Sequence, residues 1–302
     1  MEQLLSGYFV YSFAFLFVFI ALATILHMQF SLTGIVNFGI VGFWAFGMYS
    51  CALLLLKLHI PFVPAVLLAS VLTGIVSLLL GRIILNLDNQ AVLVGTLAFA
   101  TIIEYLVTTE KWLTNGVMGL GTINFPFDIG RMTLFVYFLI ILAITVLLLL
   151  YVSRLRLSPF GRLLLSIKDN ESLSQSLGKP TFRQKLVFFT FTSAVIGLFG
   201  ALTAPLYNCI FPRMIGPGVT FSIWIALMLG GRKRLFGGLI GVLASIGLFE
   251  YIIETVVPIP TKYAEMVPNV KFAVYGLTLM LVLMFRPLGI LGDEGRGAKY
   301  GK

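Results

Sequence analysis

Residues 132–152 read MTLFVYFLIILAITVLLLLYV, an apolar stretch without a single Asp, Glu, Lys or Arg. A helix of about 20 apolar residues crosses the hydrocarbon core of a bilayer. Lipid offers no hydrogen-bond partner to a backbone that leaves the helix. This stretch therefore predicts a transmembrane α-helix.

The composition of the whole chain indicates the same solvent. Of the 302 residues, 59% are hydrophobic and only 11% are charged, and the mean hydropathy is +1.03. A soluble domain needs more charge than this to cover its surface, so the excess apolar surface must face lipid. Eight further apolar runs lie at 8–26, 34–56, 61–80, 91–107, 186–207, 219–230, 235–256 and 271–285. We expect an all-α polytopic membrane protein with about 8–10 transmembrane helices, forming one domain over 1–302.

Basic residues are concentrated in the connections on one side of these runs. The net charge is +9, and placing the loop 153–185 inside the cell puts fifteen of the 21 Lys and Arg residues on the inner side. Cytoplasmic loops of membrane proteins carry such an excess, so the charge does not indicate a nucleic-acid partner. The asymmetry predicts an outside N-terminus and a cytoplasmic tail at 286–302.

The loop that follows the quoted stretch carries clear helix signals. Ser158 and Pro159 are a typical helix start, because Ser caps the N-terminus and Pro suits the first helical position. Asn170 offers a second cap, and Gly178 is a typical stop. We expect two short helices, at 159–167 and 170–177.

The first of these helices has an apolar stripe that includes Leu164 and Ile167, and the stripe has two interpretations. One is an amphipathic helix that rests on the bilayer surface. The other is a docking element for a soluble partner. Asp169 and Glu171 beside Arg162 favour docking, because a lipid-surface helix is usually basic without carboxylates.

Two Gly-interrupted stretches hint at internal symmetry. Residues 33–39, TGIVNFG, open an apolar run directed outward, and residues 216–222, GPGVTFS, open another directed inward. Paired interrupted segments of opposite direction are typical of inverted-repeat transporters. Glycine is also common in membrane helices, and this simpler explanation has equal weight.

Several motifs follow one another in order along the chain. They are Gly34-Ile35-Val36-Asn37-Phe38-Gly39, Leu113-Thr114-Asn115-Gly116-Val117-Met118-Gly119-Leu120, Ser158-Pro159-Phe160-Gly161-Arg162, Ile167-Lys168-Asp169-Asn170-Glu171 and Phe285-Arg286-Pro287-Leu288-Gly289-Ile290-Leu291-Gly292. In this order and spacing, over residues 33 to 292, they resemble the permeases of branched-chain amino acid ABC transporters, high-affinity M-type subunits.

The resemblance implies a set of partners and a location. Such permeases pair with a second permease, homologous or identical, and sit on two ATP-binding cassette subunits. A soluble extracytoplasmic binding protein delivers the solute. The membrane is the cytoplasmic membrane of a bacterium or archaeon, and lipid surrounds the helices. Branched-chain amino acids are the expected solutes, while relatives that move urea, amides, sugars or nucleosides leave alternatives.

The resemblance also implies that the loop is the coupling element in a groove of the ATPase. The residues expected at this contact are Gly161, Arg162, Leu164, Ile167, Asp169, Glu171 and Gly178. In this interpretation Gly161 allows close approach, the two apolar side chains fill a slot, and the charged residues fix the orientation at its rim.

The translocation pathway is expected near broken or Gly-rich helix backbone, which is tolerated at membrane depth only where protein or a cavity covers it. The residues expected there are Asn37, Gly39, Thr96, Thr101, Glu104 and Ser222. Asn37 would either bond freed backbone groups or line the pathway. Glu104 would be either a pathway residue or the structural partner of Lys111.

The sequence lacks the motifs of several other functions. No Gly-x-x-x-x-Gly-Lys-Ser/Thr pattern is present, so the chain must borrow energy from ATP bound by other subunits. No metal or cofactor constellation is visible, and Cys51 and Cys209 are either a disulfide or, by the better argument, two free thiols. An ion-coupled carrier remains the alternative, with Glu104 as its only candidate intramembrane carboxylate.

The predicted topology can be tested with single cysteines on a background that lacks Cys51 and Cys209. Cysteines placed in 108–131 or 257–270 should react with a membrane-impermeant maleimide from outside the cell. Those placed in 153–185 or 286–302 should react only after the membrane is opened. Outside labelling at position 170 would contradict the orientation.

Overall fold

The computed structural model describes residues 2–231 and 237–248, together with isolated positions between 273 and 284. The predicted runs 235–256 and 271–285 therefore lie partly outside the described residues, and the predicted tail 286–302 lies wholly outside them. The chain divides into two compact units, 1–220 and 221–302, and each is described by itself. The prediction of one domain stays a prediction.

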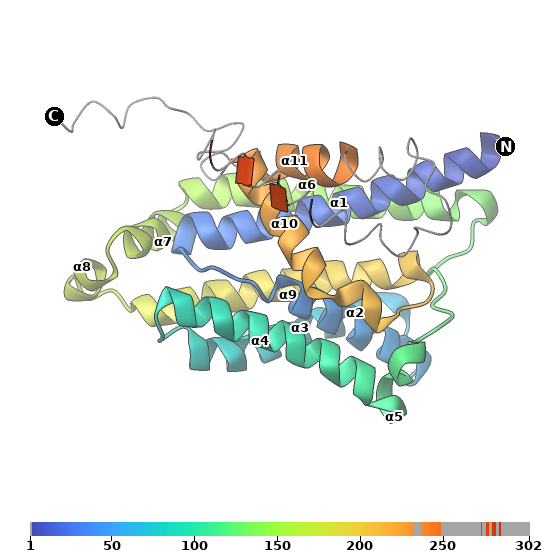
Figure 1. The fold of residues 1–302 in the computed structure, drawn as a ribbon, viewed down its shortest axis with the longest axis horizontal. Coiled ribbons are helices and arrows are strands. Elements are labelled where there is room, and N and C mark those ends of the chain that lie inside the picture. The colour runs from blue at the N-terminus through green and yellow to red at the C-terminus, as the bar shows by residue number, and fades with distance from the viewer. Residues whose placement is uncertain are drawn as a thin grey trace. The chain divides into compact units, whose positions relative to one another are not determined.

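Six long helices build the first unit (Figure 1). They are α1 (Glu2–Thr33), α2 (Ile40–Leu56), α3 (Phe62–Ile84), α4 (Asn89–Thr109), α6 (Thr133–Leu157) and α9 (Thr181–Tyr207). Shorter elements connect them: α5 (Lys111–Thr114), η1 (Gly116–Met118), η2 (Gly130–Met132), α7 (Pro159–Asp169), α8 (Glu171–Ser176) and η3 (Pro212–Ile215). Helix α10 (Pro217–Gly230) crosses the boundary between the units, and α11 (Gly237–Val242) and the π-helical turn Leu243–Leu248 belong to the second.

Helix length and composition confirm an all-α, multi-pass membrane protein. Among the described residues, six helices are long and apolar enough to cross a membrane, and α2 is a shorter apolar helix. The prediction of a helical run from 34 to 56 is wrong at its start, because residues 34–39 are not helical and α2 begins only at Ile40.

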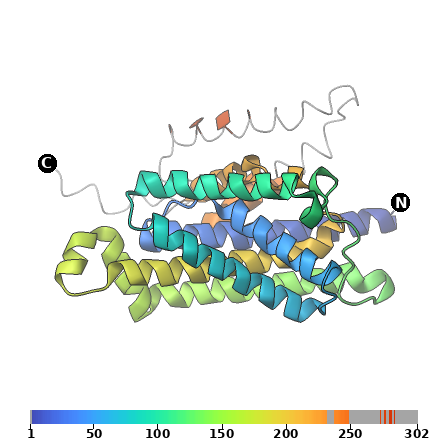
Figure 2. The same cartoon turned by 90° about the horizontal axis from the view of Figure 1, so that it is seen from below.

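The connections of the first unit gather at two ends. One end, which we call the loop end, carries α7, α8 and the C-terminus of α1, and α5 lies at the opposite end (Figures 1 and 2). At the opposite end, Lys57 Nζ donates to Trp112 O at 2.7 Å, and Leu120 pairs with Ile210 in an isolated antiparallel bridge. The segments 108–131 and 153–185, which hold α5 and α7–α8, were predicted on opposite sides of the membrane, and these helices lie at opposite ends of the unit.

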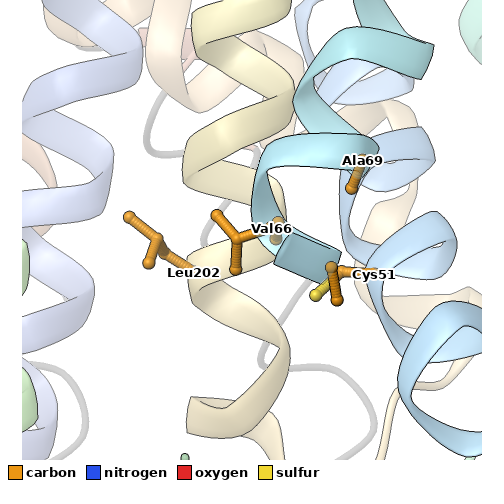
Figure 3. Packing of buried hydrophobic residues seen from close by; sticks show 6 residues of the cluster. Cys51, Val66, Ala69 and Leu202 are labelled. Atoms are coloured by element: carbon orange, nitrogen blue, oxygen red, sulfur yellow. The ribbon is translucent and has the colours of Figure 1, made fainter. Parts of the chain in front are cut away.

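The core of the first unit forms where α2, α3 and α9 meet. A Cβ on Gly47 would overlap the backbone of Gly197, and one on Gly200 would overlap Trp44 O, so α2 and α9 touch backbone to backbone. Small residues allow the close approach that drives helix association in lipid. Beside this contact, Cys51, Val66 and Leu202 belong to a buried apolar cluster (Figure 3).

Both cysteines are free thiols, with Cys51 buried and Cys209 half-buried. The choice of free thiols over a disulfide is therefore confirmed.

The outer helices of the first unit are apolar but poorly covered. In the most apolar 18-residue stretch of each helix, only 33%, 28% and 22% is buried in α3, α4 and α6, against 67% in α9. Large side chains such as Val63, Ile102 and Leu147 are more than half exposed. Such surfaces require lipid or another membrane protein as their neighbour.

Candidate functional site

The loop between α6 and α9 folds as two capped helices, which confirms the predicted elements. Ser158 Oγ accepts from the Gly161 N–H at 3.1 Å and caps α7, while Asn170 Oδ1 accepts from the Leu173 N–H at 3.0 Å and caps α8. Gly178 ends the segment at φ +76°, a left-handed conformation that favours glycine.

The apolar stripe of α7 faces the chain itself. Leu164 is fully buried, Ile167 is 2% exposed, and α7 packs on α1, α6 and α9. Gly161 is buried too, and a Cβ there would overlap Leu155 O at the end of α6. These three residues therefore fix the loop to the membrane helices.

Charged residues of the loop are also partly engaged within the chain. Glu171 forms an ion pair with Lys185 of α9, with Oε1 2.7 Å from Nζ. Arg162 is exposed, and its Nη1 donates to Leu157 O at 3.1 Å. Asp169 is exposed at the junction of α7 and α8. The ion pair ties α8 to α9, so the two short helices and the long helix form a braced unit.

The apolar groups that the loop does expose were not predicted. Leu173 is 58% exposed and Leu177 is 68% exposed, four residues apart at the far end of the loop. The periodicity of 160–167 did not reveal them, because the chain turns at Asn170 and a new helix starts with a new face. The signal that could have found them is the i, i+4 pair itself.

The break between α1 and α2 is held by a buried polar cluster. Asn37 is fully buried, its Nδ2 donates to Gln29 Oε1 at 3.0 Å, and its Oδ1 accepts from the Gly39 N–H at 2.8 Å. Gln29 Nε2 in turn donates to Thr192 Oγ1 of α9 at 2.7 Å. Asn37 thus bonds a freed backbone group, the first of its two predicted alternatives.

Thr96 of α4 completes the cluster. Its hydroxyl accepts from the Phe38 N–H at 3.0 Å and is fully buried. A Cβ on Gly39 would lie 2.5 Å from Thr96 O, so the break packs directly on α4. The structure therefore brings together Asn37, Gly39 and Thr96, which the sequence proposed for one site, and adds Gln29 and Thr192, which it missed.

Thr101 and Glu104 lie farther along α4. Thr101 is exposed, its hydroxyl donates to Leu97 O of its own helix, and Glu104 is half-buried. Glu104 Oε1 would lie 3.9 Å from a Cβ on Gly216, just before α10. Thr101 and Glu104 are three residues apart and share a helix face. Ser222 belongs to α10 in the second unit, so its position relative to this face is not described.

The family of the chain follows from the extent of its match. The family described as "Branched-chain amino acid transport system / permease component" matches residues 8–283, nearly the whole length. The chain belongs to this family. It is a multi-pass transport permease component, as the resemblance in its motifs predicted.

Three relatives show how far the similarity reaches. The high-affinity branched-chain amino acid transport system permease protein LivM of Salmonella typhimurium is 24% identical over 91% of this chain and 68% of its own. The probable branched-chain amino acid transport permease proteins LivM and LivH of Methanocaldococcus jannaschii are 24% and 26% identical, over 75% and 99% of this chain and 68% and 95% of theirs. No solved structure matches.

The polar cluster predicts a specific cost for Asn37→Ala. The substitution leaves the Gly39 N–H and Gln29 Oε1 without their buried partner, so we expect the permease to lose about 1–3 kcal/mol of stability. The matched control is Thr101→Ala, at an exposed position, with an expected change below about 0.5 kcal/mol. The measurement is the thermal unfolding midpoint in detergent, and equal midpoints for the two variants would contradict the role of the cluster.

Proposed function

We propose that the protein is the permease subunit of an ATP-driven importer of branched-chain amino acids. The match of residues 8–283 to the permease family and the names of the relatives support this proposal. In the proposed assembly it pairs with a second permease, receives solute from an extracytoplasmic binding protein and sits on two ATP-hydrolysing subunits. The membrane is the bacterial or archaeal cytoplasmic membrane, with the loop end inside.

The observation that carries the proposal is the braced loop formed by α7 and α8. ATP-driven movement occurs in another chain, so force must reach the membrane helices through a rigid contact. Buried Leu164 and Ile167 anchor α7 to α1, α6 and α9, and the Glu171–Lys185 ion pair ties α8 to α9. A loop fixed in this way can transmit movement of the ATPase to the membrane helices, which a flexible connection cannot.

The burial of the apolar stripe also weakens the alternative of a helix that rests on the bilayer. The side chains that would enter lipid, Leu164 and Ile167, already pack inside the permease. Leu173 and Leu177 remain exposed, and the exposed Asp169 comes just before α8 in the sequence. Exposed apolar groups on a loop that also carries a carboxylate suit a protein groove better than a lipid surface.

For the solute, we assign the exposed face of α4 that holds Thr101 and Glu104. An ionisable group within a membrane helix is costly and usually serves a pathway. A carboxylate can form an ion pair with the ammonium group that every amino acid carries, whereas a neutral sugar or urea can offer it only hydrogen bonds. Asn37, Gly39 and Thr96 would support this pathway indirectly, because they fix the break at 34–39 against α4.

The docking surface can be tested by replacing Leu173 and Leu177 together with Ser. Burying a Leu side chain contributes about 1.5–3 kcal/mol, so we expect the ATPase to bind at least about tenfold more weakly. Co-purification from mild detergent and titration of the ATPase onto the permease measure the loss. The matched control is Met118→Ser, an 83% exposed apolar residue at the opposite end of the unit, which should keep its ATPase. Equal binding by both variants would refute this docking surface.

The solute can be tested by uptake into vesicles that contain the complete complex. Labelled leucine, isoleucine and valine should be taken up, and urea and ribose should not. Glu104→Gln should raise the KM for leucine about tenfold, because one charge-assisted hydrogen bond contributes about 1.5–3 kcal/mol. The control is Glu110→Gln, at the end of α4, where the carboxylate bonds Trp112 Nε1. Uptake of urea or ribose alone, or an unchanged KM in Glu104→Gln, would contradict the assignment.

A further inference from the structure

The C-terminal end of α1 leaves a backbone acceptor that its own chain neighbours do not fill. The last carbonyls of a helix lack intrahelical partners. Phe30 O is reached by the Gly34 N–H at 3.2 Å, but the Ile35 N–H, which would reach Ser31 O in a continuing helix, lies 3.4 Å from Thr33 Oγ1 instead. The last turn of α1 also has no basic residue of its own.

Lys168 of α7 fills this position from another part of the chain. Its Nζ donates to Ser31 O at 2.9 Å and lies 5.7 Å from the centroid of the Phe30 ring. Its stem runs past Gly34, where a Cβ would lie 3.5 Å from Lys168 Cγ. A cation at a helix C-terminus is favourable because it meets the negative end of the helix dipole. One side chain thus lies beside Phe30, Ser31 and Gly34 at the end of α1.

On the loop side, Lys168 is firmly placed. It follows Ile167, which is buried against the membrane helices, and precedes Asp169 and the cap residue Asn170, both exposed. It therefore stands at the junction between the anchored helix α7 and the exposed helix α8. A displacement of α8 can therefore reach α1 through this junction, beside the separate connection to α9 that the Glu171–Lys185 ion pair provides.

On the membrane side, the end of α1 leads directly to the polar cluster. Thr33 Oγ1 donates to Gln29 O at 2.6 Å, and the Gln29 side chain accepts from Asn37 in the break. Gln29 lies only two residues before Ser31, so the last turn of α1 carries both the Lys168 contact and the anchor of the break. Movement of that turn must strain or move the segment 34–39.

We propose that Lys168 is the positioning residue through which movement of the docked loop reaches the α1–α2 break. The proposal rests on the proposed function, because it needs an ATPase bound to the loop. It adds a route that docking alone does not specify: from α8 through one ammonium group to the end of α1 and the Asn37 cluster. The neighbouring residues Leu164 and Ile167 hold the loop in place, whereas Lys168 bonds the end of α1, directly before the break at 34–39.

The test compares Lys168→Met, Lys168→Arg and Lys179→Met in the complete complex, reconstituted in vesicles with its ATPase and binding protein. Met keeps the length of the stem without the charge, and Arg keeps the cation. Lys179→Met removes the same charge from the same loop at a residue whose Nζ lies 3.5 Å from Ser166 Oγ. The readouts are ATPase co-purification, and solute moved per ATP hydrolysed.

We expect Lys168→Met to keep its ATPase but to move about three- to tenfold less solute per ATP, which lies within the roughly two- to thirtyfold effects that substitutions along a coupling network can have. Lys168→Arg and Lys179→Met should stay within about twofold of the parent. An unchanged ratio in Lys168→Met, an equal fall in Lys179→Met, or loss of the ATPase from Lys168→Met would each overturn the proposal. Failure of the parent complex to bind any ATPase would instead refute the proposed function.

Discussion

Residues 34–39 impose the constraint on which the rest of this permease depends, because they leave the helix within a chain that spans a membrane. Asn37 and Gly39 are buried, so the backbone groups freed at the break need partners within the protein. Asn37 accepts the Gly39 N–H, and Thr96 accepts the Phe38 N–H. Gln29 then links Asn37 to α9 through Thr192. Hydrogen bonds at this point therefore link the end of α1, the break before α2, α4 and α9.

The same break explains why the loop end is built as it is. The last carbonyls of α1 lack partners within the helix, and one of them, Ser31 O, accepts from Lys168 of α7 at the loop end. The apolar side of α7 is used up in packing, since Leu164 and Ile167 are buried. The exposed Leu173 and Leu177 lie in α8 and directly after it. Anchoring and presentation are thus divided between two short helices, and the caps at Ser158 and Asn170 separate them.

The wide apolar surfaces of α3, α4 and α6 fit a subunit that works in an assembly. A permease alone would cover them with lipid, while a pathway at the exposed face of α4 needs protein on its far side to exclude lipid. That face carries Thr101 and Glu104, which the first unit leaves exposed and half-buried. The solute route we propose therefore requires a neighbour, and the pairing with a second permease would supply one.

The sequence by itself determined the membrane class, most of the helices, the capped loop and the family, because apolar run length, cap residues and motif order are local properties. The run 8–26 lies within α1, the run 132–152 lies within α6 except for Met132, and Ser158 and Asn170 cap the helices they were expected to start. Only the tertiary structure decided which way each side chain faces. Periodicity defines an apolar face but not its neighbour, so Leu164 and Ile167 were expected at a partner and proved to be core. Gln29 gave no signal in the sequence, because both of its partners lie outside α1. Asn37 belongs to the break at 34–39, and Thr192 belongs to α9, 163 residues away.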